Sequence, residues 1–234
     1  MLAAFAHWSL EPGAARVADV AAGTGRLTRE LAAAGAEVTA VEPVDEMRAY
    51  IREARAVPGT AESLPFADAE LDAVFAAEAF HWFDAPAALR EFARVLRPGG
   101  GLALLWNVGL PQDEDQPWRQ EVVERVRDVY YHPHGRRTPA ASGNDPRDDT
   151  AEWRTGPGWE LFEPLEQRSF EHVQRMTRDG YLAFVNSWSF VGAMEEGPRA
   201  ELLGEVGAIL DRHGAAEFEQ RWRTDLYVTA RRAG

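Results

Sequence analysis

The fold of this chain is decided by Val17-Ala-Asp-Val-Ala-Ala-Gly-Thr-Gly-Arg-Leu-Thr28, where an apolar strand passes through a turn of small residues directly into a helix. Ala21, Ala22, Gly23 and Gly25 carry almost no side chain, so a ligand can approach the backbone of the turn. The unpaired N–H groups at the start of the helix face a polar or negatively charged group. An ordinary strand–helix turn has the same local pattern, so the following segments must separate the two interpretations.

The next segment favours a nucleoside-binding turn. Gly35 predicts the end of the helix, and Glu37-Val-Thr-Ala-Val41 predicts a short strand that ends at Glu42. An acidic residue at the end of the second strand, about 20 residues beyond such a turn, is placed to accept hydrogen bonds from both ribose hydroxyls. This spacing favours the interpretation that Glu42 contacts a ligand over the alternative that it is an ordinary exposed glutamate at a strand end.

A dinucleotide-binding enzyme would use the same arrangement, but its glycine motif is incomplete here. A G-x-G-x-x-G motif that begins at Gly23 has Thr28 at its third position, and one that begins at Ala21 has Arg26 there. Because the third glycine permits close packing beside a pyrophosphate, its absence argues against NAD or FAD. The chain also has no lysine and therefore no Tyr-x-x-x-Lys of a reductase. A nicotinamide-dependent reductase stays as an alternative.

Four segments, taken in order, resemble the class I S-adenosylmethionine-dependent methyltransferases, in the group of small-molecule and quinone-type enzymes. The segments are Asp19-Val-Ala-Ala-Gly-Thr-Gly25, Val41-Glu-Pro-Val-Asp-Glu-Met47, Gly59-Thr-Ala-Glu-Ser-Leu-Pro-Phe66 with Leu71-Asp-Ala-Val-Phe75, and Leu96-Arg-Pro-Gly-Gly-Gly-Leu-Ala-Leu-Leu-Trp106. They cover roughly the first half of the chain, and the second half matches more loosely.

The resemblance implies a role for individual residues toward S-adenosylmethionine. Asp19 and the turn would hold its methionine part, Glu42 its ribose hydroxyls, and Met47 would pack against its adenine. The cofactor-binding residues implied in this way are Asp19, Ala21, Ala22, Gly23, Gly25, Glu42, Pro43, Met47, Thr60, Ala61, Glu62, Ala77 and His81.

Two of these positions depart from the pattern of the family. Many relatives carry Asp where this chain has Thr60, so the resemblance does not extend to a side-chain contact with the adenine amino group there. Ala21 replaces the first glycine of the commoner motif. We expect a backbone angle at Ala21 that a Cβ tolerates.

Composition excludes several other classes of protein. The chain of 234 residues has no cysteine, which excludes a disulfide framework and a thiolate metal site. Its formal charge of −13, with every base an arginine, disfavours nucleic acids and anionic membranes as partners. It has no long apolar segment and no secretory leader pattern, so we expect a cytoplasmic protein. The resemblance implies that it acts on a small-molecule acceptor. The oligomeric state is left open.

Strands and helices alternate as far as Trp106, which predicts a parallel sheet covered on both faces. Asp84–Leu96 predicts a helix capped by Asp84. Later segments predict two further strands and two helices: Leu165–Val173, Phe218–Ala230, Arg178–Trp188 and Pro198–His213. The predicted fold is α/β: a Rossmann-like, doubly wound, seven-stranded and mostly parallel sheet with an antiparallel last strand, in three layers.

Residues 109–160 differ in composition, being rich in Pro, Asp, Arg and Gly. We interpret them as an insertion in a single domain of residues 1–234, with a helix over Pro117–Tyr131 and a loop after it. The resemblance implies that this insertion caps the substrate pocket; a connection without a role is the alternative.

Methyl transfer requires little acid–base chemistry, because the sulfonium carbon is already activated and the enzyme mainly aligns the reactants. The segment Ala76-Ala-Glu-Ala-Phe-His-Trp-Phe83 follows a strand, at the end of the sheet where ligands bind in open α/β folds. His81 is the first candidate for a catalytic polar contact, although a histidine that only bonds nearby backbone is an equal alternative. Glu78 is a weaker candidate for a base. The predicted acceptor-pocket walls are Phe80, Trp82, Trp106 and Tyr130.

No metal site is predicted, because His132-Pro-His134 lacks a third ligand. Members of the resembled family usually carry a helical segment before the first strand that closes over the cofactor, whereas Met1–Pro12 precede Gly13 here. We therefore expect either a truncated chain or a more open cofactor site. A cofactor-binding protein without catalysis is the third hypothesis.

Overall fold

The structure, a computed structural model, describes residues 1–110, 117–131, 152–192, 194–214 and 217–233. The chain divides into two compact units, one of residues 1–107, 140–170 and 224–234 and the other of residues 108–139 and 171–223. We describe each unit by itself.

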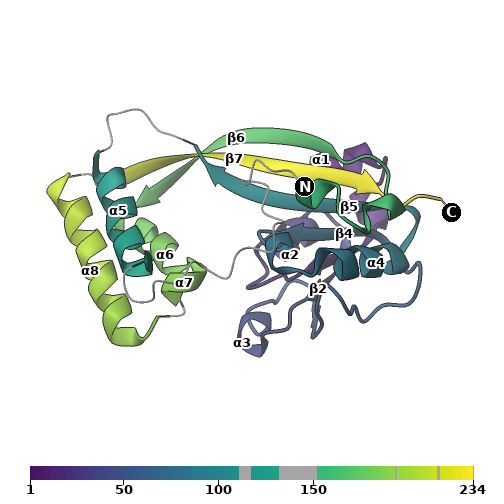
Figure 1. The fold of residues 1–234 in the computed structure, drawn as a ribbon, viewed down its shortest axis with the longest axis horizontal. Helices are drawn as coiled ribbons and strands as arrows, with labels where there is room; N and C mark the ends of the chain where they lie inside the picture. The colour runs from purple at the N-terminus through teal and green to yellow at the C-terminus, as the bar shows by residue number, and fades with distance from the viewer. Residues whose placement is uncertain (111–116, 132–151, 193, 215–216, 234) are drawn as a thin grey trace. The chain divides into compact units, whose positions relative to one another are not determined.

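The described residues form a seven-stranded sheet in the order β3-β2-β1-β4-β5-β7-β6. Its first five strands are parallel neighbours, and β7 runs antiparallel between β5 and β6 (Figure 1). The strands are β1 (Arg16–Val20), β2 (Glu37–Val41), β3 (Arg55–Val57), β4 (Leu71–Ala77), β5 (Leu96–Gly109), β6 (Glu166–Thr177) and β7 (Glu217–Ala230). The predicted Rossmann-like sheet with an antiparallel last strand is confirmed.

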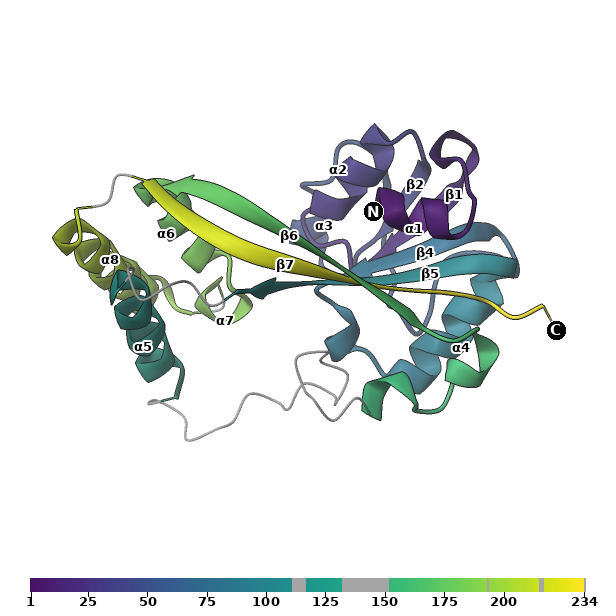
Figure 2. The same ribbon diagram turned by 90° about the horizontal axis from the view of Figure 1, so that it is seen from above.

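The helices of the first unit cover both faces of its part of the sheet. Figure 2 shows α1 (Leu2–His7) and α2 (Arg26–Ala33) on one side of β4 and β5, and α4 (Ala85–Val95) on the other. The short helices in this unit are η1 (Pro12–Ala14), α3 (Asp45–Arg48), η2 (Phe80–Trp82), η3 (Glu152–Arg154) and η4 (Trp159–Leu161). This is the expected three-layer arrangement, with apolar side chains buried on both sheet faces.

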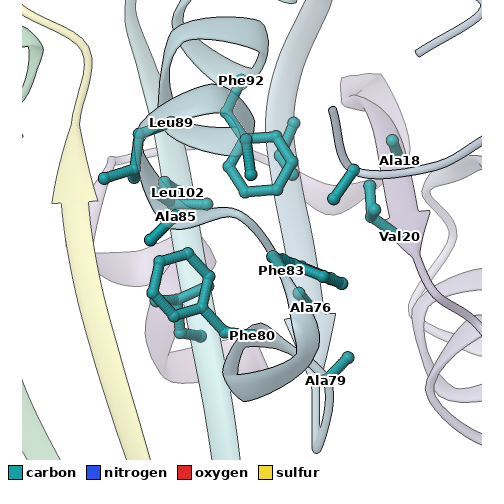
Figure 3. Packing of buried hydrophobic residues seen from close by; sticks show 14 of the residues in the cluster. Ala18, Val20, Ala76, Ala79, Phe80, Phe83, Ala85, Leu89, Phe92 and Leu102 are labelled. Carbon is teal, nitrogen blue, oxygen red and sulfur yellow. The ribbon is translucent and has the colours of Figure 1, made fainter. Parts of the chain in front are cut away.

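Helix α4 begins and packs as its sequence predicts. The carboxylate of Asp84 accepts a hydrogen bond of 3.2 Å from the Ala87 N–H, so it caps the helix. Leu89 and Phe92 are fully buried in the core on this face, and Figure 3 shows Phe92 turned inward with Phe83 and Phe80 near it. The cap and the apolar stripe together fix the helix that follows β4.

The segment Met1–Pro12 packs against the opposite sheet face. Phe5 of α1 is buried with its ring 5.4 Å from that of Phe75. Trp8 donates its indole N–H to the Thr229 carbonyl at 3.0 Å, and its ring occupies the space where a Cβ on Gly101 would stand. Gly101 is therefore required by the close approach of this tryptophan to β5.

The second unit contains the helices α5 (Pro117–Tyr131), α6 (Arg178–Asn186), α7 (Ser189–Gly192) and α8 (Glu196–Arg212). Its core includes Trp118, Val206 and Phe218. Helix α5 has the bounds that the sequence predicts, and α6 and α8 match within two residues, whereas α7 was not predicted as a separate helix. The cap role of residues 109–160 stays a prediction; residues 111–116 and 132–151, with His132 and His134, lie outside the described part.

Candidate active site

The small-residue turn after β1 uses backbone angles that side chains rarely adopt. Gly23 and Gly25 have φ values of 57° and 81°, and Ala21 has a φ of 55°. The expectation of a Cβ-tolerant angle at Ala21 is therefore wrong, since the left-handed region costs a non-glycine residue about 1–2 kcal/mol. Strain of this kind is concentrated in turns that hold ligands, where the surrounding structure enforces it.

The N-cap residue of helix α2 has no side chain to cap the helix. Its N-cap residue is Gly25, which makes no side-chain hydrogen bond. A Cβ at Gly25 would stand 2.9 Å from Cγ1 of Ile51, so the glycine is needed for packing as well as for its angle. The Asp19 carboxylate supplies an acceptor for one of the first N–H groups of α2, that of Thr28, whereas Gly25 has no side chain to supply one for the N–H groups before it.

Glu42 joins the turn to the loop after β2. Its side chain is buried, one carboxylate oxygen accepts from the Gly23 N–H at 2.8 Å, and the other accepts from the Val44 N–H at 3.0 Å. Arg48 supports this loop by donating to the Glu42 carbonyl at 2.7 Å. A carboxylate has about four acceptor positions, so Glu42 retains capacity for two ligand hydroxyls while its orientation is already fixed.

Asp19 lies under the turn, in the middle of the sheet, between Ala40 of β2 and Phe75 of β4. It is 1% exposed and accepts a hydrogen bond of 2.5 Å from the Thr28 hydroxyl. Burial raises the pKa of Asp19 to about 7, with a smaller contribution from the charge of Glu42, while bonds from Thr28 oppose the rise. A ligand cation near this carboxyl would favour its ionised form.

The residues implied for the adenine side lie on two loops. Met47 is 46% exposed on α3, close in sequence to the exposed Val44, and Pro43 is also exposed. Exposed apolar side chains beside a strand-end carboxylate offer a surface for a flat ring. On the other loop Ala61 is buried, Thr60 is exposed, and Glu62 accepts from the Asp84 N–H at 3.0 Å; Ala77 is half-buried at the end of β4.

His81 lies in η2, directly after β4, and is 8% exposed. Trp106 of β5 donates its indole N–H to His81 Nδ1 at 3.3 Å. Because an indole can only donate, Nδ1 must accept, and a neutral His81 carries its proton on Nε2. His81 is thus arranged as a hydrogen-bond donor through Nε2, and not as a base at that nitrogen.

Glu78 has a structural position at the end of β4. Its φ is 54°, its N–H donates to the Leu105 carbonyl at 2.8 Å, and its carboxylate accepts from the Asn107 N–H. These bonds tie β4 to β5 beside His81. The role of Glu78 as a base stays a prediction.

The predicted acceptor walls differ in exposure. Phe80 and Trp106 are fully buried, whereas Trp82 is 58% exposed with its ring 4.9 Å from that of His81. Tyr130 belongs to α5 in the second unit, and its side chain is outside the described part. Of these four residues, Trp82 therefore offers the accessible surface beside His81.

Comparison with known proteins identifies the family. Residues 18–104 match the family model described as "Methyltransferase domain". An uncharacterized methyltransferase of Mycobacterium tuberculosis is 36% identical over 212 residues, which is 89% of this chain and 78% of that protein. The chain belongs to the class I S-adenosylmethionine-dependent methyltransferases.

Other relatives agree with this family. A malonyl-[acyl-carrier protein] O-methyltransferase of Erwinia pyrifoliae is 42% identical over 95 residues, or 38% of this methyltransferase and 36% of that protein. A solved structure from Anaeromyxobacter dehalogenans, assigned provisionally to the type II methyltransferases, covers 97% of this chain and 95% of its own, with a TM-score of 0.60 and 24% identity. The latter likeness concerns the fold alone.

The structure of this methyltransferase also brings together residues that the sequence did not single out. Arg154 of η3 donates to the Tyr227 hydroxyl at 2.9 Å, although 73 positions separate them. Trp153 contacts the rings of Phe80 and Trp106. No local pattern marks these residues, because their contacts depend on the path of the chain between distant elements.

The described residues contain neither a membrane-spanning helix nor a cluster of metal ligands. None of the described helices has the length and apolar character needed to cross a bilayer. Within the same residues, no group of three or more His, Asp or Glu side chains is arranged to hold a metal ion.

Proposed function

We propose that this methyltransferase transfers the methyl group of S-adenosylmethionine to a small-molecule acceptor. The observation that carries the proposal is the buried carboxylate of Glu42, held by the Gly23 and Val44 N–H groups at the end of β2. This carboxylate is fixed before a ligand arrives, so it can accept from two ribose hydroxyls without reorganisation.

The other residues of the turn fit the remaining parts of the cofactor. The N–H groups of α2 that precede Thr28 suit the methionine carboxylate, and the buried Asp19 suits the methionine ammonium. Met47 and Val44 supply an apolar surface for adenine. When bound, the cofactor supplies a methyl group already activated by the sulfonium.

The protein's own contribution to the reaction is then mainly positioning. His81 donates a hydrogen bond through Nε2 to a polar atom of cofactor or acceptor, and its bond from Trp106 keeps the ring orientation fixed. Trp82 provides an aromatic surface beside it. No general base is needed when the acceptor nucleophile reaches the site ionised or as a free amine.

The chemistry of the acceptor is limited by charge as well as by this site. A formal charge of −13 without lysine supports a small molecule in preference to a nucleic acid or an anionic membrane. The relative that acts on malonyl-[acyl-carrier protein] matches little more than a third of this chain, so it favours the reaction type and does not specify the acceptor. A cytoplasmic location stays a prediction from the sequence.

Calorimetric titration with S-adenosylhomocysteine and, separately, NADH tests the cofactor. We expect micromolar binding of the former and a loss of about 100-fold or more in Glu42→Ala, since two charge-assisted hydrogen bonds disappear. Glu46→Ala is a matched control on the same loop, because Glu46 is exposed on α3. Binding of NADH alone would overturn the proposal in favour of a reductase, and binding without turnover across an acceptor screen would favour a non-catalytic protein.

A further inference from the structure

An aromatic cluster in the first unit contains a buried indole N–H for which the described residues supply no hydrogen-bond acceptor. The ring of Trp153 packs 5.1 Å from that of Tyr227, 5.6 Å from Trp106, 6.0 Å from Phe80 and 6.1 Å from Trp159. Trp153 is 3% exposed, and its Nε1–H has no hydrogen-bond partner among the described residues. A buried donor without an acceptor costs about 1–3 kcal/mol. In native proteins such a group therefore usually binds a water or an ion, or has a functional role.

The other indoles of the cluster show that acceptors were available to the fold. Trp106 donates its indole N–H to His81, and Trp159 donates to the Trp153 carbonyl at 2.5 Å. The indole N–H of Trp153 is the exception among these three. In this cluster the indole N–H of Trp153 therefore needs an acceptor that the described residues do not supply.

Arg154 adds a second donor and a positive charge at the same place. Its guanidinium carbon lies 5.2 Å from the Trp153 ring centre and 4.8 Å from that of Tyr227, and it donates to the Tyr227 hydroxyl at 2.9 Å. Its Nε–H is buried, and the part of the chain that the structure describes supplies no partner for it. Among the described residues Arg154 forms no ion pair with a carboxylate, although its side chain as a whole is only half-buried.

The two donors stand next to the acceptor side of the proposed active site. Phe80 and Trp106, which contact Trp153, are respectively the neighbour of His81 in sequence and its hydrogen-bond donor. All of these residues belong to the first unit. Trp153 therefore contacts two residues that lie directly beside His81 in sequence or in space, namely Phe80 and Trp106.

We propose that the acceptor carries a carboxylate on an apolar or aromatic body, and that Arg154 and Trp153 bind this carboxylate. A guanidinium offers a planar fork of N–H donors that matches a carboxylate, and the neighbouring indole N–H adds a donor of fixed direction. The rings around them match an apolar body. The inference rests on the proposed function and specifies its substrate class.

The test uses the full-length protein saturated with S-adenosylhomocysteine, whose binding is measured first by calorimetry. Monocarboxylates from acetate to benzoate and 3-phenylpropionate are then titrated, each compared with its primary amide. We expect at least one aromatic acid to bind about tenfold or more tightly than its amide. If the wild type does not bind S-adenosylhomocysteine, the proposed function is refuted. If it binds S-adenosylhomocysteine but binds acids and amides equally, only the carboxylate subsite is refuted.

Three variants assign the effect to these residues. In Arg154→Gln we expect the preference for the acid to disappear, with amide and S-adenosylhomocysteine binding unchanged. Arg154→Lys keeps the charge and should retain part of the preference, and Trp153→Phe keeps the packed ring but should weaken acid binding several-fold. Arg90→Gln, at an exposed arginine of α4, is the matched control. If Arg154→Gln or Arg154→Lys folds and binds the acid as the wild type does, the assignment of the carboxylate subsite to Arg154 is overturned. This outcome does not depend on whether Trp153→Phe folds.

Discussion

The cofactor side and the acceptor side of the proposed active site are built in different ways. On the cofactor side the turn after β1 and the carboxylate of Glu42 lie 19 positions apart and are joined through backbone N–H groups. On the acceptor side the contacts join η2, β5, η3 and β7, and side chains make them. A site built from backbone tolerates little change in chain geometry, whereas a site built from distant side chains can change its ligand while the fold is kept.

The largest expected effect tests the backbone side of this comparison. In Gly25→Ala, the new Cβ meets Ile51 at 2.9 Å and the residue keeps a φ of 81°. Strain and overpacking together are expected to lower the free energy of unfolding by about 2–5 kcal/mol. Urea unfolding measures this change. Gly99→Ala is a control for the angle alone, since φ is 77° and nothing lies within 4 Å of its Cβ position; an equal loss in both variants would show that contact with Ile51 contributes nothing.

The second prediction uses the buried carboxyl of Asp19. Its pKa is about 7 in the folded protein and 3.8 in the reference state, so the folded chain retains a proton that the unfolded chain has released. Binding of this proton therefore contributes fully to the free energy of unfolding below about pH 4, and the contribution is lost as the pH rises through about 7. Asp19→Asn removes this loss and should raise the free energy of unfolding near pH 8 by about 2–4 kcal/mol.

Denaturant unfolding of both proteins at several pH values checks this sign. The wild type should lose stability relative to Asp19→Asn between about pH 4 and pH 8. We also expect the variant to bind S-adenosylhomocysteine more weakly, because the neutral amide lacks the charge that attracts the ligand ammonium. A variant that is less stable than the wild type at pH 8 would contradict the cost assigned to burial of the carboxyl.

The same division explains how far the sequence predicts the molecule. The strand ending at Glu42, the Asp84 cap and the helix Pro117–Tyr131 follow from short-range patterns of capping and periodicity, and the structure has them. The contact of Arg154 with Tyr227 spans 73 positions and leaves no periodic or local pattern. The angle at Ala21 was also missed, because alanine is compatible with ordinary turn angles and only the bonding around the turn imposes the left-handed one.

A third prediction concerns the side-chain half of the comparison. Trp106→Phe removes the indole N–H that reaches His81 and reduces the volume of a fully buried side chain. We expect a loss of about 1–3 kcal/mol in the free energy of unfolding, from one hydrogen bond and a small cavity. Among the described residues no hydrogen bond joins Trp106 to the cofactor turn, so S-adenosylhomocysteine binding should weaken only to the extent that it depends on the orientation of His81.

Nitrogen-15 spectra of the histidine rings test the accompanying change in His81. In the wild type the neutral ring should carry its proton on Nε2, and in Trp106→Phe the Nδ1–H tautomer should become populated because its acceptor position is released. His81→Asn assigns the resonances among the six histidines. A wild-type ring protonated on Nδ1 would contradict the donor role of His81.

The smallest expected effect returns to the turn and asks whether its strain is needed. Ala21 and Gly23 have nearly the same φ, 55° and 57°, but one carries a Cβ. Ala21→Gly should therefore stabilise the protein and Gly23→Ala should destabilise it, each by about 1 kcal/mol, since nothing lies within 4 Å of a Cβ at Gly23. Thermal unfolding of both variants measures the pair. If the gain in Ala21→Gly is accompanied by weaker S-adenosylhomocysteine binding, the alanine restricts the turn to its ligand-binding form; if binding is unchanged, the hydrogen bonds of Glu42 are enough to hold that form, and the strain at Ala21 serves no purpose in the site.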